Sequence, residues 1–211
     1  MLKKIHSVYD DEFKAYGRIL TGFDTKEIED EAKKIPHPAE GSSYQASVKE
    51  FEKLKIFGEI EKACYGTLPS QLGFCWGHNR VMNAMEYHFC NEINIAVTPL
   101  VLILGHTGDI QNGKVDSSVF RAFYVPKGAV LEIFSSTLHF CPCQTSDEGF
   151  RCVVGLSKDT NLPLDEPTDD PFLFRKNKWL IAHVENRGLI ARGGVPGITG
   201  ENYLVPYENE F

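Results

Sequence analysis

The sequence lacks long apolar segments and has few cysteines, and both features argue against whole classes of protein. No apolar run reaches the roughly 20 residues of a membrane-spanning helix, and residues 1–13 lack the apolar stretch of a secretory signal. Six cysteines in 211 residues are too few for a disulfide-dense scaffold, and none forms the C-x-x-C pair of a zinc ribbon or a thioredoxin site. We therefore expect a cytoplasmic protein with reduced thiols and no membrane partner.

Clustered positive charge is also absent. The net charge is −7 and the lysines and arginines are scattered, whereas nucleic-acid-binding proteins gather them on one surface. The glycine-rich segment 188–201 matches neither the phosphate-binding nor the dinucleotide-binding loop pattern. We expect no nucleic-acid partner, and we expect this segment to form a mobile loop or a cap over a cavity mouth.

Short apolar segments separated by turn signals fill the middle of the chain, from Gly73 to Leu156. Many short strands with such punctuation predict an all-β antiparallel barrel or sandwich. Residues 1–40 differ: Val8 to Leu20 favours a short helix or a helical turn, and Asp24 with Glu27 has the pattern of a capping box before a second helix. The predicted organisation is a single domain, with a helical extension at 1–40 before a barrel at 41–211.

One stretch contains three candidate metal ligands: Glu86, His88 and Glu92 have the spacing E-x-H-x3-E. Residues two apart in a strand point to the same face, so Glu86 and His88 should project together. His139 ends a later apolar strand. Carboxylates and imidazoles that converge in this way predict a site for one divalent metal ion, Mn, Fe, Ni or Zn. Cys90 and Cys141 lie near enough in sequence to add a thiolate, which would favour zinc.

These residues resemble the two motifs of the cupin superfamily. Glu86 stands where the first cupin histidine usually lies, and Pro126 to Gly128 followed by His139 is similar to a stretched second motif. Three phrases, EYHFCNEINIA, VPKGAVLEIFSSTLHFCPC and GLSKDTNLPL, resemble an uncharacterised bacterial cupin family, domain of unknown function 4867, over about residues 41–206. The resemblance implies a cupin β-barrel, a double-stranded β-helix, that binds metal through Glu86, His88, Glu92 and His139.

Further side chains are candidates for catalysis and substrate binding. Glu86 is either a metal ligand or a base, and Glu132, which alternates with apolar neighbours, is predicted to point inward as a second candidate base. Four other residues are candidate substrate contacts with cationic or hydrogen-bonding groups: His78, Arg121, Tyr124 and Lys127.

The predicted function is that of a metal-dependent enzyme on a small sugar or sugar acid, an aldose–ketose isomerase. The resemblance contributes, because several cupin isomerases bind one metal through histidines and a glutamate. The alternatives are a cupin lyase on a small carboxylated or ureido substrate and a non-catalytic sugar-binding cupin. Exposed sheet edges tend to be covered, so we also expect a homodimer.

Overall fold

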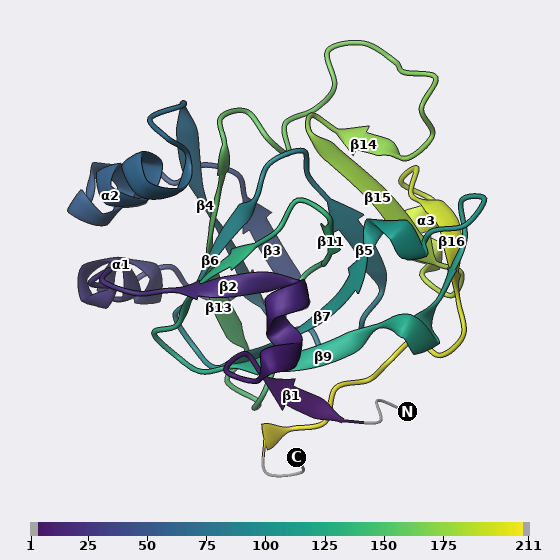
Figure 1. Cartoon of the computed structure of the whole chain (residues 1–211), viewed down its shortest axis with the longest axis horizontal. Helices are drawn as coiled ribbons and strands as arrows, with labels where there is room; N and C mark the ends of the chain where they lie inside the picture. Colours follow the sequence, from purple (N-terminus) through teal and green to yellow (C-terminus); the bar gives the residue numbers. More distant parts are fainter. Residues whose placement is uncertain (1–3, 209–211) are drawn as a thin grey trace.

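The structure, a computed structural model that describes residues 4–208, is mostly β-sheet with three short α-helices (Figure 1). Its centre is a six-stranded antiparallel sheet that curves into a half-barrel. The strands, in spatial order, are β2 (Gly17–Leu20), β10 (Val130–Ile133), β6 (Glu92–Ala96), β13 (Phe150–Ser157), β4 (Ser70–Gly77) and β3 (Ser42–Gln45).

Alternation along β6 gives this sheet two different faces. Ile93 and Ile95 pack against the helices, whereas Ala96 belongs to the core inside the half-barrel. Glu92 and Asn94 share the parity of Ala96, so they point into the same interior. This alternation is what sends the polar side chains of β6 toward the cavity described below.

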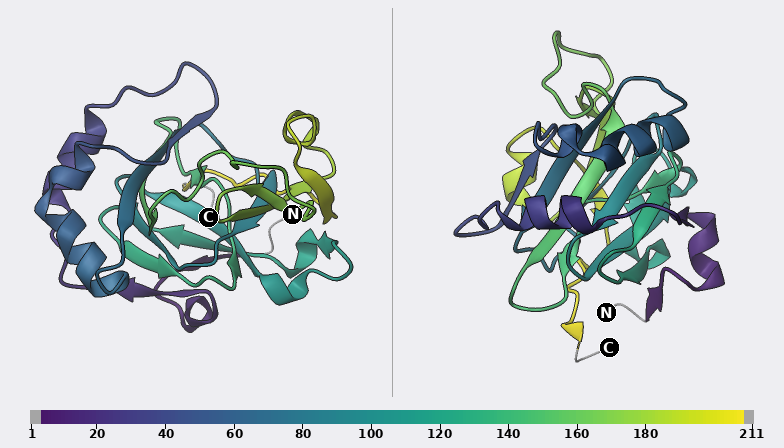
Figure 2. Two further views of the ribbon diagram at one scale, coloured as in Figure 1. Left: turned by 90° about the horizontal axis from the view of Figure 1, so that it is seen from above. Right: turned by 90° about the vertical axis from the view of Figure 1, so that its left-hand side faces the viewer.

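Two helices cover the outer face of the sheet, α1 (Lys26–Lys33) and α2 (Lys55–Cys64), with the 3-10 helix η2 (Phe51–Lys53) beside them (Figure 2). Ile28 of α1 and Ile60 of α2 are fully buried against β6. Full burial of one such side chain stabilises the fold by about 1.5 to 3 kcal/mol. The helices therefore hold the back of the sheet, and the site lies on the other side.

Two further sheets complete the molecule. The first contains β1 (Ile5–Ser7), β9 (Arg121–Val125), β7 (Leu100–His106), β11 (Thr137–Leu138) and β12 (Cys143–Gln144). The second contains β14 (Leu173–Arg175), β15 (Lys178–His183), β16 (Val195–Thr199), β8 (Val115–Asp116) and β5 (Ala84–Tyr87). The remaining short helices are η1 (Asp11–Ala15), η3 (Thr107–Asp109), η4 (Ser117–Val119) and α3 (Arg187–Ile190).

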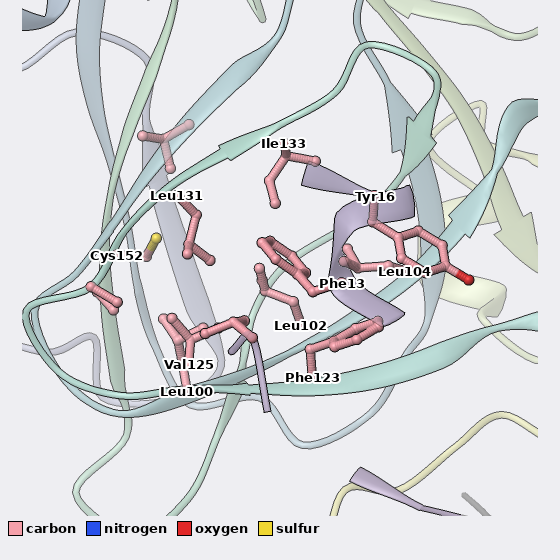
Figure 3. Packing of buried hydrophobic residues seen from close by; sticks show 14 of the residues in the cluster. Phe13, Tyr16, Leu100, Leu102, Leu104, Phe123, Val125, Leu131, Ile133 and Cys152 are labelled. Carbon is pink, nitrogen blue, oxygen red and sulfur yellow. The ribbon is translucent and has the colours of Figure 1, made fainter. Parts of the chain in front are cut away.

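A core of buried apolar side chains fills one end of the half-barrel (Figure 3). Leu131 and Ile133 of β10 meet Leu102 of β7 there, and the rings of Phe13 and Phe123 pack edge to face at 5.5 Å between centroids. Aromatic pairs in this geometry add about 0.5 to 1.5 kcal/mol beyond their buried area. This packing fixes the relative position of β7, β9 and β10.

The N-terminal segment is less helical than its sequence indicates. Of the short helix or helical turn expected over Val8 to Leu20, the structure has the 3-10 helix η1, and the remainder forms β2, which pairs with β10. Pairing with β9 likewise makes β1 a strand, so tertiary contacts override a weak local preference. The predicted capping box is also not formed, because α1 begins after Thr25 and Asp24 accepts only from the amide of Lys26.

Within residues 4–208, no helix has both the length and the apolar character needed to cross a bilayer. The six-stranded sheet ends in the short strands β2 and β3, whose outer edges have no strand partner among the described residues. The homodimer stays a prediction.

Candidate metal centre

A cavity of about 480 Å³ lies between β3 and β4 of the six-stranded sheet and the opposing β15 and α3. Its wall is rich in amides and hydroxyls, with Asn79, Asn83, Asn94, Asn161 and Asn186 among the lining residues. This volume is within the range of about 300 to 1,000 Å³ that is typical of small-molecule sites. Glu86, Glu92 and His139 also line it.

A backbone bridge brings the first two site segments together. The amide of Glu86 donates to the carbonyl of His139 at 2.6 Å, and the amide of His139 donates to the carbonyl of Glu86 at 3.0 Å. His88 follows two residues after Glu86, just beyond the end of β5. The E-x-H spacing therefore delivers a carboxylate and an imidazole beside a second imidazole from a distant part of the chain.

Both imidazoles are buried and held in one orientation. Nδ1 of His88 lies 2.6 Å from the carbonyl of Asn177, and Nδ1 of His139 lies 3.0 Å from the carbonyl of Thr137. A carbonyl only accepts, so each Nδ1 carries the proton. Neither Nε2 atom has a hydrogen-bond partner in residues 4–208. Both Nε2 atoms are therefore available to a ligand, and a buried nitrogen without a hydrogen bond is costly unless another partner compensates.

Two carboxylates face these nitrogens. Oε2 of Glu92 lies 3.4 Å from Nε2 of each imidazole, and its Oε1 accepts from Nδ2 of Asn94 at 2.8 Å. Oε1 of Glu86 lies 4.0 Å from Nε2 of His88, and its Oε2 pairs with Lys178. Lys178 reaches Glu86 because β15 and β5 are antiparallel neighbours, which makes the two residues diagonal partners on one face.

Charge is strongly coupled across this cluster. Burial alone would raise the pKa of the Glu92 carboxyl, but the adjacent imidazoles of His139 and His88 hold it far below its usual range. Burial alone would lower the pKa of His139, but Glu92, helped by Glu86, raises it to about 9. A metal ion bound here would take the place of the proton that His139 otherwise carries, since metal ligands bind deprotonated.

The donor set suits a divalent ion. Glu86, His88 and His139 each offer an atom within 4.8 Å of the other two, and this buried group could hold a metal ion. Ligand atoms about 2.1 Å from one ion lie about 3.0 to 3.4 Å apart in octahedral or tetrahedral sets. The 3.4 Å separations of Glu92 from both imidazoles match this spacing, and the 4.0 Å separation of Glu86 from His88 is wider.

Glu132 is buried as expected, but it does not join the site. It shares the parity of Val130, which packs with the helices on the outer face of the sheet. Its carboxylate pairs with Arg18 and accepts from Nδ2 of Asn91 at 2.9 Å. The prediction that Glu132 points inward is therefore corrected: β10 places Leu131 and Ile133, not Glu132, inside the half-barrel.

The four predicted substrate contacts also lie away from the cavity wall. The ring of His78 packs on that of His37, with centroids 5.3 Å apart, while its neighbour Asn79 lines the cavity. Tyr124 donates to Glu208 at 2.8 Å, and Lys127 pairs with Glu29 of α1 at 3.4 Å. Arg121 is exposed on β9 and lines a separate hollow with Lys4 and His6.

Of the two cysteines considered as ligands, only Cys141 lines the cavity. Its sulfur lies 3.9 Å from that of Cys75, another wall residue. Cys90 instead contacts the hydroxyl of Ser157 at 3.3 Å. The group of three that could hold an ion contains no thiol.

Sequence reasoning missed Lys178 and Arg192, the two cations of the wall. Lys178 belongs to a short basic patch that is typical of a surface. The sequence signal that could have identified it is parity, because Lys178 lies on the same strand face as Leu180 and Ala182, both of which are buried. Of the two alternatives for the glycine-rich segment, a mobile loop or a cap over a cavity mouth, the structure agrees with the second: β16 lies within the segment, and Leu189 and Arg192 line the cavity.

Comparison with known proteins adds one decisive result. A family described as Domain of unknown function (DUF4867) has a sequence model that matches residues 5–203. The chain belongs to this family. The DUF4867 match includes residues 5–40, which supply β1, β2 and α1. No curated protein matches the chain.

Proposed function

We propose that this chain is a cupin-like, metal-dependent enzyme that isomerises a small sugar or sugar acid between its aldose and ketose forms. The observation that carries the proposal is the pair of buried Nε2 atoms of His88 and His139, which have no hydrogen-bond partner within residues 4–208 and face the carboxylates of Glu92 and Glu86. The half-barrel around them and the order of the motif residues support the cupin fold, the double-stranded β-helix.

In this proposal His88, His139 and Glu92 hold one divalent ion, Mn, Fe, Ni or Zn. Asn94 and the carbonyls of Asn177 and Thr137 orient these ligands, as outer partners do in metal sites generally. When bound, the ion would supply a Lewis acid that polarises a substrate carbonyl. The amide-rich wall would bind the hydroxyl groups of the sugar.

Glu86 is assigned the role of proton carrier. Isomerisation through an enediol needs a carboxylate that takes a proton from one carbon and returns it to the neighbouring carbon. Glu86 lines the cavity, and Lys178 holds one of its two oxygens. That contact leaves the second oxygen to take up and release the proton while the carboxylate stays in place.

Metal content and proton exchange test the proposal in two steps. Protein prepared without chelator is analysed for metals and then titrated with Mn, Fe, Ni and Zn; one ion per chain is expected. The loaded protein is next incubated with pentoses, hexoses and uronates in deuterated water. Conversion with deuterium in the product supports the isomerase.

The other outcomes discriminate among the remaining classes. Failure to bind any of the four metals overturns the metal centre. Metal-dependent cleavage of a carboxylated or ureido compound would indicate a lyase, and sugar binding without conversion would indicate a binding protein. Conversion without solvent deuterium overturns the role given to Glu86.

A further inference from the structure

A divalent ion bound in the cavity would leave an excess of positive charge there. The wall carries two carboxylates, Glu86 and Glu92, and two cationic side chains, Lys178 and Arg192. In the proposed function Glu92 binds the divalent ion and Glu86 pairs with Lys178, so the cavity with its ion would carry two positive charges more than negative ones. The imidazoles add no negative charge, because they bind metal in the neutral form.

Arg192 is the cation without a partner. Lys178 already pairs with Glu86. Among residues 4–208, the guanidinium of Arg192 makes neither an ion pair nor a hydrogen bond, although it lines the cavity. The chain as a whole has a net charge of −7, so the excess of positive charge that a bound ion would create in this cavity contrasts with the charge of the whole chain.

The turn that contains Arg192 is held by backbone hydrogen bonds. The amide of Arg192 donates to the carbonyl of Leu189 at 3.0 Å, and the amide of Gly194 donates to the same carbonyl at 3.0 Å. Gly193 has a φ of +97°, and a Cβ on Gly194 would lie 3.0 Å from Cγ of Leu189. The positive φ of Gly193 favours glycine, and a Cβ on Gly194 would be crowded by Leu189. The close packing of this turn limits the positions from which the side chain of Arg192 can project.

A second unpaired group on the wall is an acceptor. Oδ1 of Asn161 is buried and has no hydrogen-bond partner in the described part of the chain, while Nδ2 of Asn161 donates to the hydroxyl of Tyr44 at 2.8 Å. An unpaired acceptor suits a ligand hydroxyl, and an unpaired guanidinium suits an anionic oxygen group, which it can bind through two parallel hydrogen bonds.

We propose that Arg192 determines specificity by binding the anionic end, a carboxylate or a phosphate, of a polyhydroxylated substrate. This inference deepens the proposed function by selecting sugar acids and sugar phosphates over neutral sugars. Arg192 contacts neither the imidazoles nor their carboxylates, so it contributes to substrate binding without holding the metal.

The test compares the anionic probes D-gluconate and D-glucose 6-phosphate with neutral D-glucose. Calorimetric titration of the zinc-loaded protein is expected to show at least about 10-fold tighter binding of one or both anionic probes than of glucose. Arg192→Gln should weaken that binding roughly 10- to 100-fold, the loss of a charge-assisted bidentate contact. Glucose binding should not change, and Arg192→Lys should retain part of the affinity.

Arg187→Gln is the matched control. It removes the same charge from the exposed side of α3, outside the cavity wall, and it should leave all three affinities unchanged. Equal binding of anionic and neutral probes, no binding of any probe, or undiminished anion binding by Arg192→Gln would each overturn the inference. Which of the two anionic probes binds tells a carboxylate from a phosphate substrate.

Metal analysis separates this inference from the proposed function. Arg192→Gln should keep its full metal content, since Arg192 is not a ligand. If the wild-type protein binds no metal but still prefers anionic probes in a manner that depends on Arg192, the metal centre fails and the anion site stands. If metal binds and Arg192→Gln has no effect on probe binding, the metal centre stands and the anion site at Arg192 fails.

Discussion

Two asparagine–glutamate pairs with buried carboxylates lie on opposite faces of the six-stranded sheet, and their carboxylates contact different neighbours. On the inner face Asn94 donates to Glu92 at 2.8 Å, and on the outer face Asn91 donates to Glu132 at 2.9 Å. Glu92 then faces two imidazoles, whereas Glu132 faces the single cation of Arg18. Burial of a carboxylate is thus shared by both pairs, and the remaining partners decide what each can do.

The outer pair has protein partners for both of its carboxylate oxygens, whereas the inner pair contacts groups that lack hydrogen-bond partners. The acceptors of Glu132 are all used by protein donors, and the pair ties β10 and the segment before β6 to β2. In the inner pair, Glu92 lies beside the Nε2 atoms of His88 and His139, which lack hydrogen-bond partners within residues 4–208. A buried polar network with open positions is costly unless a ligand completes it. The following predictions test whether the two faces differ in this way.

The largest effect is expected from removal of an imidazole. His88→Ala and His139→Ala should each abolish metal binding, because three ligand atoms from the chain are reduced to two. Elemental analysis after dialysis against zinc measures this loss directly. His106→Ala is the control: its ring stacks on Tyr16 at 4.5 Å between centroids, outside the cavity wall, and metal content should not change.

The next effect concerns turnover. Glu86→Gln should keep the metal and reduce turnover by roughly 100- to 10,000-fold, the range for loss of a general base. Glu132→Gln removes a buried carboxylate from the other face and should leave turnover unchanged. Turnover of both variants is measured with whichever sugar the wild-type protein converts. Loss of metal in Glu86→Gln would instead identify Glu86 as a ligand.

The sequence was informative where spacing alone decides geometry. Glu86 and His88 share one face of a strand by parity, and the backbone bridge to His139 brings together the residues that the motifs indicate. Alternation predicted that Glu132 is buried. Both faces of β10 are buried, however, so alternation alone does not say on which face Glu132 lies. Only the pairing of β10 with β2 and β6, under α2, decides which interior the carboxylate enters.

The substrate contacts could not be predicted for a related reason. Arg121, Tyr124 and Lys127 lie on or just after β9, and nothing local shows that β9 belongs to a different sheet from the cavity wall. Arg192 and Lys178 reach the cavity through long-range pairing of β15 with β5 and of β16 with β15. Such contacts are set by tertiary topology, which residue types and spacing do not specify.

A smaller effect is expected from the two asparagines. Asn94→Ala removes the donor that orients Glu92, and zinc affinity should fall about 10- to 100-fold, as for other outer partners of metal ligands. Asn91→Ala makes the same change on the outer face and should leave zinc affinity unaltered. Competition with a chromophoric chelator measures both affinities. Equal losses in the two variants would mean that the effect is general destabilisation, and the contrast between the faces would fail.

The smallest effect is expected from Glu132→Gln, and it concerns stability alone. Glutamine keeps an oxygen that can accept from Asn91, but its NH₂ group replaces the oxygen that faces Arg18, so two donors oppose each other. The side chain of Arg18 is 62% exposed, so water screens much of the lost attraction. We expect a loss of about 1 kcal/mol in the free energy of unfolding, measured by urea denaturation. In an Arg18→Gln background the same substitution should cost less, because the opposing donor is gone. A change in metal content in Glu132→Gln would show instead that the outer face is coupled to the site.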